Sequence, residues 1–532
     1  MSDEEDDDDF GHIRWWDDYE ITGKTEASRE RQSQIYFDRL NKLYEYCKTD
    51  VEAERLAEKK LYPLIPSERE VYLLDQRIND RGIGVDLETA RLALGLVEQG
   101  ASRLNARLVQ ITNGLVTSLS QRDKLVRWFA SKGCHFPSLD KQGVTNALKD
   151  KTLPAEVREV LYLRQIGAKS STKKLQAILN MADAEGRIHG NLLYHGASTG
   201  RFAGKGVQLQ NLPRPELLKE PEDAIPYIHR GNIDEIELCY GPVQTVVADV
   251  IRSLIQAGPG KVLYAADFAA IEARVLAWIA GQDSLVKQFA DGDDIYCNFG
   301  SIIYNKPINK KQHPRERQVA KAAVLGLGYA MGAPKFALTC AKDQIFLEEE
   351  EYKRVVTLYR ETYSHIPKLW YALERAAIKA INNPTKVVTL RNMKFRMRDD
   401  NLRLLLPSGR ALNYPKAKVE AVKTPWGEMK QGVVIGAVNA LTRKWERTVV
   451  SPGTFTENVV QAVSRDLMVE SMFRLERHKY PVVLTVHDEV VSEVDEGYGD
   501  VAEYEALVAA TPEWAAGLPV KAEGWSGKRY RK

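Results

Sequence analysis

The chain has 532 residues, enough for three or four domains at roughly 100–200 residues each. Its 44% hydrophobic and 28% charged residues exclude a mostly disordered protein. No run approaches the roughly 18 charge-free apolar residues of a membrane span, and the acidic N-terminus is unlike a signal peptide. Five scattered cysteines without a CxxC pair argue against disulfides and structural zinc, so we expect a reducing, cytoplasmic location.

Charge is distributed unevenly along the sequence. The first twenty residues hold ten acids against one arginine, whereas the remainder carries 74 Lys and Arg against 63 Asp and Glu. A moderately basic remainder tolerates a polyanionic partner without requiring one. We expect residues 1–30 to form a solvated, disordered acidic tail. The alternative is a segment that mimics nucleic acid and covers a basic cleft.

Helical periodicity dominates the first third of the chain. Residues 31–62 have apolar side chains spaced by three and four, a second helical stretch spans 67–82, and 86–182 continue as amphipathic helices. A polar break in the last of these groups hydroxyls with cations, among them Lys173 and Lys174. Such a helix junction suits phosphate oxygens, although a solvated loop is the simpler alternative.

Strand-like segments follow from about residue 186. Short apolar runs at Lys261–Ala266, Tyr480–Val486 and Val490–Val494 alternate with long helices, and residues 285–395 are largely helical and rich in Lys and Arg. The pattern predicts an α+β protein. We expect a mixed sheet lobe that is interrupted by a helical insertion and preceded by a helical arm.

Carboxylates stand at the ends of two predicted strands. One strand ends at Asp267, where the backbone holds the side chain while its head reaches solvent, although Asp is also a common helix N-cap. In the second segment His487, Asp488 and Glu489 separate two β-branched runs, which predicts a hairpin with its acids at or near the turn. Adjacent carboxylates repel, and Mg²⁺ is often held by one or two carboxylates together with substrate phosphates. An exposed turn with two harmless acids is the alternative.

A predicted helix face groups four further candidates. Arg317, Lys321, Leu325 and Tyr329 are spaced by four and span about 120° of one face. Arg and Lys one turn apart can bind a triphosphate, while Leu and Tyr offer a surface to a base. A plain amphipathic helix is the alternative, but three glycines in the segment count against it.

A polar segment precedes the first carboxylate. Thr199-Gly200-Arg201 is followed by Gln208-Leu209-Gln210-Asn211-Leu212-Pro213, with short strands and turns expected throughout. Gln, Asn and Arg at this density suit hydrogen bonding to base edges and the sugar–phosphate backbone. This segment therefore suggests a nucleic-acid contact.

Together, and in this order, these segments resemble family A DNA polymerases, the DNA polymerase I family, most closely those of bacteriophages and prophages. Asp267-x₄-Glu272-x-Arg274 resembles motif A, Arg317-x₃-Lys321-x₇-Tyr329 motif B, and His487-Asp488-Glu489 motif C. The likeness extends over roughly residues 67–532. It implies a right-hand polymerase whose parts would be an acidic tail 1–30, an exonuclease remnant 31–66, a thumb 67–185, a palm 186–284 and 400–532, and fingers 285–399.

The resemblance also implies the chemistry. Asp267 and Asp488 would ligate two Mg²⁺ ions, with Mn²⁺ as a substitute, and the Phe268 carbonyl and Glu489 would complete the metal site. Arg317 and Lys321 would bind the phosphates of the incoming dNTP, and Lys321 would donate a proton to the leaving pyrophosphate.

The same resemblance implies how sugar, base and DNA are held. Glu272 would exclude a ribose 2′-hydroxyl, and Tyr329 would stack near the templating base. Contacts to primer–template DNA are expected from residues of the polar segment, the predicted hairpin and two helices: Arg201, Gln210, Asn211, Gln461, His487, Lys173 and Lys174.

Four positions depart from the family pattern. Leu325 replaces an aromatic residue that packs on the nucleotide sugar, so the use of dideoxynucleotides is open. Tyr296 stands where a histidine is usual; it can donate one hydrogen bond to a phosphate but carries no positive charge. Ala269 and Ala270 replace a more polar pair. None of these changes removes an essential chemical group.

The N-terminal region is the largest departure. Tyr46-Cys47-Lys48-Thr49-Asp50 resembles the third motif of a 3′–5′ proofreading exonuclease, but only 45 residues precede it. We therefore expect Asp50 to be structural and proofreading to be absent from this chain. Whether a separate exonuclease or replisome proteins assist it stays open, and a phage-encoded enzyme would act in the host cytoplasm.

Three other classes of protein share part of this pattern with a DNA polymerase. A single-subunit RNA polymerase shares the two aspartates, but it must admit the 2′-hydroxyl that Glu272 would exclude. A two-metal nuclease has no use for Arg317, Lys321 and Tyr329 on one face. A scaffold that only binds primed DNA would not need the Asp267 and Asp488 pair.

Overall fold

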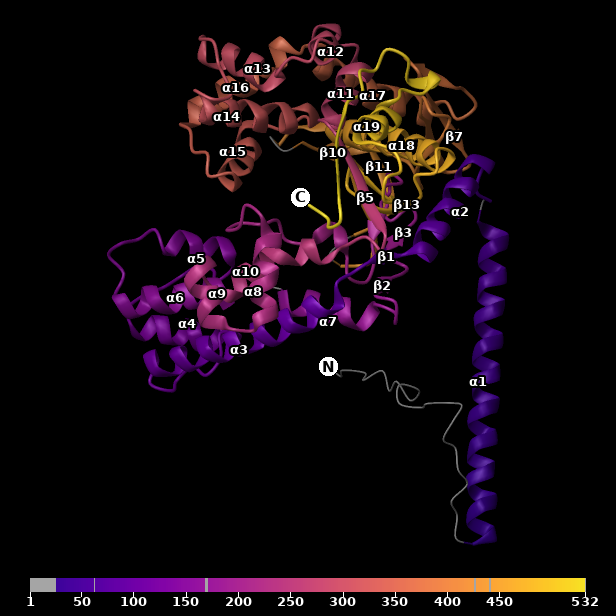
Figure 1. The fold of residues 1–532 in the computed structure, drawn as a ribbon. Helices are drawn as coiled ribbons and strands as arrows, with labels where there is room; N and C mark the ends of the chain where they lie inside the picture. Colours follow the sequence, from indigo (N-terminus) through magenta and orange to yellow (C-terminus); the bar gives the residue numbers. More distant parts are fainter. Residues whose placement is uncertain (1–24, 62, 168–170, 425–426, 440–441, 532) are drawn as a thin grey trace. The chain divides into compact units, whose positions relative to one another are not determined.

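The computed structural model describes residues 25–61, 63–167, 171–424, 427–439 and 442–531. The chain divides into two compact units, residues 1–70 and 71–532. Among the described residues, no helix is long and apolar enough to cross a membrane. Figure 1 traces the elements along the chain.

The first unit contains one long helix, α1 (Glu26–Lys60). The Thr25 side chain caps it by accepting a hydrogen bond from the Ser28 amide, and Glu26 and Lys60 complement the helix dipole at its two ends. The predicted helix over 31–62 is confirmed as far as Lys60, and Tyr62 lies outside the described residues. The predicted tail is wrong over its last residues, because 26–30 form the start of α1. Residues 1–24 lie outside the described residues.

Helices build the segment predicted to be a thumb. Its tip has its own small apolar core, which includes Leu125, Phe129 and Leu161, whereas Leu74, Leu96 and other residues nearer its base belong to the main core. Asp86 starts the long helix of this segment by accepting a hydrogen bond from Thr89. The helices are α2 (Pro66–Arg81), α3 (Leu87–Ile111), α4 (Arg122–Ser131), α5 (Lys141–Ala147), α6 (Ala155–Gly167) and α7 (Ser171–Met181).

Short strands and helices lead from the thumb segment to the central sheet. Apolar side chains of the helices, among them Ile228, Ile236 and Val246, join the main core. The elements are β1 (Ile83–Gly84), β2 (Arg187–Ile188), β3 (Leu192–Leu193), β4 (Ala203–Gly204), α8 (Ile225–Arg230), α9 (Ile233–Tyr240) and α10 (Val243–Val250).

The central sheet has four antiparallel strands in the order β13-β14-β5-β15. The predicted strands are present as β5 (Lys261–Phe268), β13 (Val482–Val486) and β14 (Glu489–Asp495), and β15 (Ala522–Gly527) forms the edge. Asp267 of β5 lies opposite Glu489 of β14, so both side chains leave the same face of the sheet. The long helix α18 (Pro452–Arg477), α11 (Ile271–Ala280) and α19 (Val501–Ala509) join the strands to the same core.

The helical insertion follows α11, and Figure 1 shows α12 to α16 grouped together. The predicted fingers, 285–399, are helical as far as Asn382, but strands that the sequence did not predict occupy 388–398. The helices are α12 (Asp283–Ala290), α13 (Ile295–Tyr304), α14 (Pro314–Gly326), α15 (Ala333–Lys342), α16 (Glu349–Thr362) and α17 (His365–Asn382).

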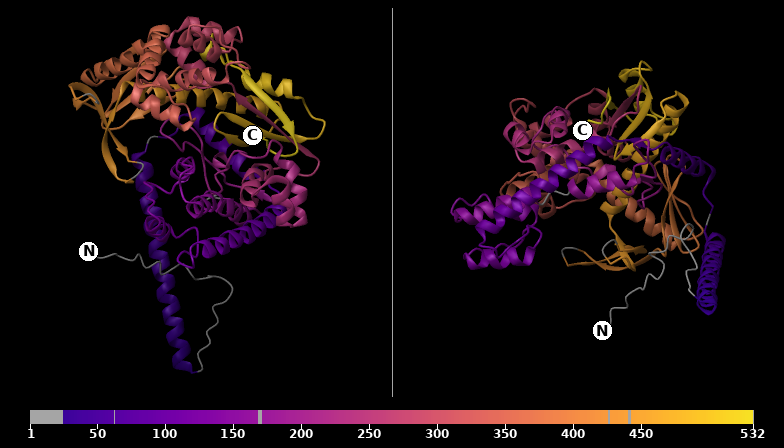
Figure 2. Two further views of the ribbon diagram at one scale, coloured as in Figure 1. Left: turned by 90° about the vertical axis from the view of Figure 1, so that its left-hand side faces the viewer. Right: turned by 60° about the horizontal axis from the view of Figure 1, so that its bottom comes forward.

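Two further antiparallel sheets separate the insertion from α18. The first contains β6 (Val388–Leu390), β7 (Met393–Arg398), β8 (Asn401–Leu405) and β9 (Ala411–Tyr414). The second contains β10 (Lys418–Lys423), β11 (Met429–Val438) and β12 (Trp445–Val450). In the left view of Figure 2 the orange hairpins of these strands lie together at one edge of the picture.

Candidate active site

Two aspartates meet where β5 and the β13–β14 hairpin end. Asp267 lies on β5, and Asp488 lies in the two-residue turn, whose His487 takes a left-handed backbone conformation (φ 54°). The Phe268 amide donates a 3.1 Å hydrogen bond to the Asp488 carbonyl, which ties the turn to the end of β5. The predicted hairpin is confirmed, and its turn lies beside the end of β5.

The electrostatics of this pair favour a cation. Burial raises the pKa of Asp488, and the nearby acids Glu272 and Asp267 raise it further, while Arg201 opposes the shift. The closest Arg201 and Asp488 atoms, Nη2 and Oδ1, are 3.9 Å apart. Excess negative charge in a half-buried site is what a divalent cation relieves.

Glu489 directly follows the turn, within the predicted placement at or near it, but it is buried and so differs from the alternative of an exposed turn. It is the first residue of β14, is 1% exposed, and accepts a 2.8 Å hydrogen bond from the Tyr530 hydroxyl. That hydroxyl is buried too, and burial beside Glu489 raises its pKa. Glu489 is therefore held in the sheet beside Asp267, and Tyr530 is a site-supporting residue that sequence reasoning missed.

Glu272 links three segments of the chain. It lies in the first turn of α11, where one carboxylate oxygen forms an ion pair with Arg201 and the other accepts a 2.6 Å hydrogen bond from the Tyr329 hydroxyl. Burial, together with the charge of Glu272, raises the pKa of Tyr329 well above its ordinary value. Beside them a cavity of about 260 Å³ is lined by residues that include Glu272, Leu325, Tyr329 and Asp488. Four predicted site residues thus surround one space.

The expected helix face is only partly continuous. Arg317, Lys321 and Leu325 lie on α14, but that helix ends at Gly326 and Tyr329 belongs to a following 3₁₀ turn. The predicted single helix through Tyr329 is therefore wrong. The Gly328 carbonyl accepts a 2.6 Å hydrogen bond from the Trp370 indole, which holds the turn in place.

Arg317, in the first turns of α14, is held in place by contacts to Asp294 and Tyr296. The Arg317 Nε donates a 2.8 Å hydrogen bond to Asp294, and its guanidinium lies 5.1 Å from the centre of the Tyr296 ring. Burial opposes ionisation of Asp294, but hydrogen bonds from Arg317 and the Cys297 amide outweigh it, so the pKa of Asp294 is lowered. Tyr296 thus packs on Arg317 at the start of α13.

The predicted DNA contacts occupy several environments. Gln210 is 9% exposed, and its amide donates a 3.1 Å hydrogen bond to the Thr485 carbonyl, whereas Asn211 and His487 are exposed. Gln461 on α18 accepts a 3.5 Å hydrogen bond from Thr199. Gln210 is therefore engaged within the protein, and Gln461 lies beside the polar segment.

The polar helix junction is not part of this group. Lys174 donates a 2.7 Å hydrogen bond to the Val207 carbonyl, and burial lowers the pKa of its ammonium group. Lys173 is exposed next to it. Lys169 and Ser170 of the same junction lie outside the described residues. Lys174 thus anchors the segment that leads to Gln210, a long-range contact without a sequence signal.

A buried ion network supports the polar segment from behind. Arg410 is 6% exposed and donates to Asp466 of α18 at 2.7 Å and to the Thr199 carbonyl at 2.9 Å. Arg465 donates a 3.0 Å hydrogen bond to the Gly200 carbonyl. Sequence reasoning missed these residues because partners more than 200 positions apart leave no local pattern.

The donors present fit a hard divalent cation. Asp267 and Asp488 offer carboxylate oxygens beside the Phe268 backbone, and oxygen donors of this kind suit Mg²⁺. Within the described part of the chain, no group of three or more His, Cys, Asp and Glu side chains is arranged to hold a metal ion. A site with two carboxylates leaves its remaining positions to backbone, water and substrate oxygens.

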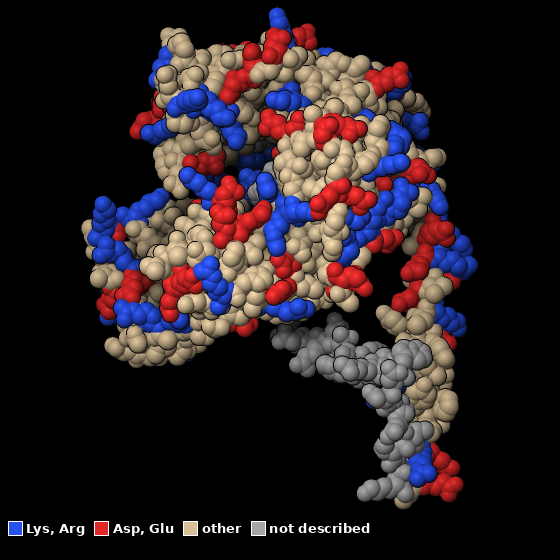
Figure 3. Space-filling view, in the orientation of Figure 1, with Lys and Arg blue, Asp and Glu red and all other residues tan. Residues whose placement is uncertain are grey.

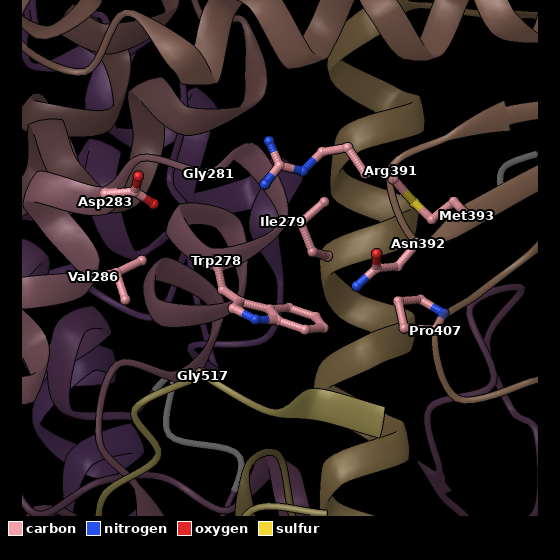
Figure 4. A pocket seen from close by; sticks show the side chains of 10 residues that line it. All are labelled: Trp278, Ile279, Gly281, Asp283, Val286, Arg391, Asn392, Met393, Pro407 and Gly517. Carbon is pink, nitrogen blue, oxygen red and sulfur yellow. The ribbon is translucent and has the colours of Figure 1, made fainter. Parts of the chain in front are cut away.

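A second cavity, of about 280 Å³, lies at the other end of α11 (Figure 4). Its largest side chains are engaged within the protein: the Trp278 indole donates to the Ala516 carbonyl at 3.2 Å, and Arg391 donates to the Ala280 carbonyl at 3.1 Å. No predicted site residue lines it. Predicted site residues thus line the cavity between Glu272 and Asp488 and not this one.

The fold and the site define a nucleotidyltransferase of the right-hand polymerase class. The family model for DNA polymerase family A matches residues 109–415. A DNA polymerase of Bacillus phage SP02 is 33% identical over 507 residues, covering 93% of this chain and 76% of the phage protein. The chain belongs to family A of the DNA polymerases and is a DNA-directed DNA polymerase.

More distant comparisons agree on the fold. A thermostable DNA polymerase I of Thermus filiformis is 23% identical over 483 residues, covering 88% of this chain but 48% of the Thermus protein. The solved POL domain of Pol1 from M. smegmatis, in complex with DNA primer-template and dNTP, superposes with a TM-score of 0.57 at 18% identity. That alignment covers 86% of this chain and 70% of the solved chain.

Proposed function

We propose that this polymerase extends a primer 3′-hydroxyl with dNTPs on a DNA template by a two-metal mechanism, and that it serves phage DNA replication. The observation that carries the proposal is the position of Asp267, at the end of β5, beside Asp488 in the adjoining β13–β14 turn. Asp488 borders the cavity that α14 also lines through Leu325. The likeness to the SP02 phage enzyme supports the replicative role.

Asp267 and Asp488 would hold two Mg²⁺ ions together with the Phe268 carbonyl, and Glu489 would support them from within the sheet. When bound, the ions lower the pKa of the primer hydroxyl and neutralise the triphosphate. Mn²⁺ substitutes because it accepts the same oxygen donors. The bond between the primer 3′-oxygen and the α-phosphorus forms while the bond from that phosphorus to the bridging oxygen breaks, and pyrophosphate leaves.

Cations on α14 bind the phosphates of the incoming nucleotide. Arg317 is oriented by its hydrogen bond to Asp294, so its remaining N–H groups can meet phosphate oxygens with little loss of side-chain entropy. Lys321 lies one turn further on the same helix and donates the proton that the leaving pyrophosphate takes up. Tyr296 adds a hydroxyl donor beside Arg317.

Glu272 and Tyr329 select the sugar and support the templating base. Their hydrogen bond fixes the carboxylate at the cavity wall, where its bulk and charge exclude a ribose 2′-hydroxyl. Arg201, Asn211, Gln461 and His487 contact the primer–template, with Lys173 near its backbone. Gln210 and Lys174 act indirectly, by shaping the polar segment.

We infer further that this chain does not proofread. Tyr46 and Asp50 lie on the single helix α1, none of whose described side chains is buried. An exonuclease centre requires several carboxylates held together by a folded core. Proofreading would then come from a separate polypeptide or be absent altogether.

Extension of a 5′-labelled primer with Mg²⁺ and dNTPs tests the proposal, with Asp488→Asn as the control. Extension by the native chain and its loss in the variant are expected. A lane without dNTPs tests proofreading, and an intact primer is the expected result. Shortening of the primer without extension would refute the polymerase assignment and favour a nuclease.

A further inference from the structure

The outer face of the β6–β9 sheet is strongly basic. Its inner side chains, including Phe395, Leu404 and Tyr414, are buried. Successive side chains of a strand point to opposite faces, so the residues between these buried ones lie on the outer face. Four of those outer residues, on the neighbouring strands β7 and β8, are cations. We call this surface the basic sheet face and define it by Lys394, Arg396, Arg398 and Arg403.

Two of these cations face each other across the sheet. Arg396 of β7 lies directly opposite Arg403 of β8, and like charges in such a cross-strand pair destabilise a sheet. Lys394, Arg396 and Arg403 form no ion pair with another residue among those the structure describes. In the adjoining sheet, by contrast, Arg447 is paired with Glu420. Uncompensated repulsion of this kind is relieved by an external anion.

The strands of the basic sheet face carry charges of one sign. On the face shown in Figure 3, Lys and Arg side chains are interspersed with Asp and Glu. The basic sheet face carries no acid on its strands, and Asp399 and Asp400 stand only at the β7–β8 turn. Rows of cations at the spacing of alternate strand residues suit a polymer of phosphates better than a single small anion.

An exposed aromatic side chain lies beside one further cation, Lys416. Lys416, which follows β9, lies with its Nζ 5.8 Å from the centre of the Trp445 ring, and Trp445 is 54% exposed. The indole rests on Gly436, where a Cβ would come within 2.4 Å of the ring. Cations beside an exposed aromatic ring are typical of surfaces that bind unpaired bases.

A continuous stretch of backbone connects this ring to the nucleotide site. Strand β12 begins at Trp445 and spans about 20 Å to Val450, and Ser451 then caps α18. Gly453 of that helix contacts the Tyr329 backbone so closely that a Cβ would come within 2.3 Å of the Tyr329 carbonyl oxygen. The chain segment that begins at Trp445 therefore ends next to Tyr329, the residue proposed for the templating position.

We propose that the basic sheet face, with Lys416 and Trp445, binds the single-stranded template that has not yet been copied. The phosphates meet Lys394, Arg396 and Arg403, while an unpaired base stacks on Trp445. The strand then passes along β12 toward Tyr329. This inference rests on the DNA-synthesis function proposed above, and it assigns a path to the template outside the cavity.

Affinity for the 5′ overhang tests the proposal. Binding of labelled primer–templates with overhangs of one or fifteen nucleotides is measured by fluorescence anisotropy without dNTPs or Mg²⁺, across a range of salt. The longer overhang should bind about tenfold more tightly to the native chain. The double variant Arg396→Ala/Arg403→Ala should lose most of this gain and lower the salt slope by about 1.4, because single strands contribute about 0.7 per phosphate. Trp445→Ala should lower the affinity for the primer–template with the longer overhang about fivefold.

The control removes the same charge from another surface. Lys368→Ala/Arg375→Ala takes two exposed cations from α17 and should bind both overhangs as the native chain does. Thermal unfolding shows whether each variant is folded. Primer extension by the native chain is measured separately, so that failure of the proposed function is distinguished from failure of this surface.

Three results would overturn the proposal. An unchanged gain from the long overhang in the Arg396→Ala/Arg403→Ala variant would show that this face does not bind the template. An equal loss of affinity for the one-nucleotide and the fifteen-nucleotide overhang would show that the basic sheet face binds duplex DNA. The third result concerns a deletion of residues 1–24. If this deletion tightened DNA binding by the otherwise native chain but not by the Arg396→Ala/Arg403→Ala variant, the acidic N-terminal segment would occupy the basic sheet face instead of the template.

Discussion

Tyr329, in the turn after α14, donates a 2.6 Å hydrogen bond to Glu272 in the first turn of α11. Arg201 forms an ion pair with the other oxygen of the same carboxylate. Glu272 is thus held from two segments that are far apart in the sequence. The position of this carboxylate at the cavity wall depends on both partners.

Removal of the Glu272 carboxylate should weaken sugar selection. Glu272→Ala is expected to raise incorporation of ribonucleotides relative to deoxyribonucleotides at least about tenfold, because the wall of the cavity recedes. Single-nucleotide extension with matched dNTP and rNTP measures the ratio. Tyr329→Phe keeps the carboxylate and should change the ratio less; an unchanged ratio in Glu272→Ala would exclude the role in sugar selection.

Neutralising either aspartate should abolish synthesis. Asp267→Asn and Asp488→Asn are each expected to slow extension by about 1,000-fold, because the several kcal/mol of charge stabilisation supplied through a bound metal is lost. Affinity for primer–template, measured by anisotropy, should stay within about tenfold. Retained synthesis in either variant would contradict the metal assignment.

Leu325 should influence how the sugar is held. It is 41% exposed and lines the cavity beside Glu272, so an aromatic ring there gains contact with the nucleotide. Leu325→Tyr is expected to change the ratio of dideoxynucleotide to deoxynucleotide incorporation by several-fold, about 1 kcal/mol. Leu338→Phe, on exposed α15, is the control. If neither variant changed the ratio of dideoxynucleotide to deoxynucleotide incorporation, Leu325 would not contact the sugar.

Asp75 should make stability depend on pH. Burial raises its pKa to about 6, and only hydrogen bonds from Gln76 and Asn79 oppose this shift. The pKa of Asp75 is higher in the folded state than in the unfolded state. The contribution of this carboxyl group to the free energy of unfolding is therefore complete below about pH 4 and is lost as the pH rises through 6. Asp75→Asn is expected to stabilise the protein at pH 8 by on the order of 1–3 kcal/mol and hardly at pH 4.

Thermal unfolding at both pH values measures the effect of that substitution. Asp80→Asn, at an exposed position of the same helix, is the matched control and should change the Tm little at either pH. A Tm for Asp75→Asn that rises equally at pH 4 and pH 8 would show that the buried charge is not the cause.

Tyr530 should support the site through Glu489. Tyr530→Phe removes a buried hydrogen bond to Glu489, which is expected to cost about 1–3 kcal/mol of stability and to slow extension several-fold. Tyr504→Phe is the control, because its hydroxyl bonds to Val490 and Ser492 on the same strand but not to Glu489. Denaturant unfolding and primer extension are measured for both. Equal loss of activity in the two variants would show a general effect on the sheet.

Local patterns were sufficient for the elements that bear the chemistry. β-branched runs and helical periodicity predicted β5, the β13–β14 hairpin and α14, because each depends on residues close in sequence. The same reasoning failed at Tyr329, where α14 ends early, and over β6 to β12. Hydrogen bonds between β7 and its neighbours, and packing of its inner face, decide that sheet.

The sequence by itself determined which residues could do the chemistry, since carboxylates, cations and their order along the chain are properties of the residue types. Only the tertiary structure decided which of them meet. Glu489 turns into the sheet toward Tyr530, Lys174 bonds to the Val207 carbonyl, and Arg410 reaches Thr199 from 211 positions away. These contacts depend on chain closure and burial, where an unpaired polar group is costly, so no local pattern encodes them.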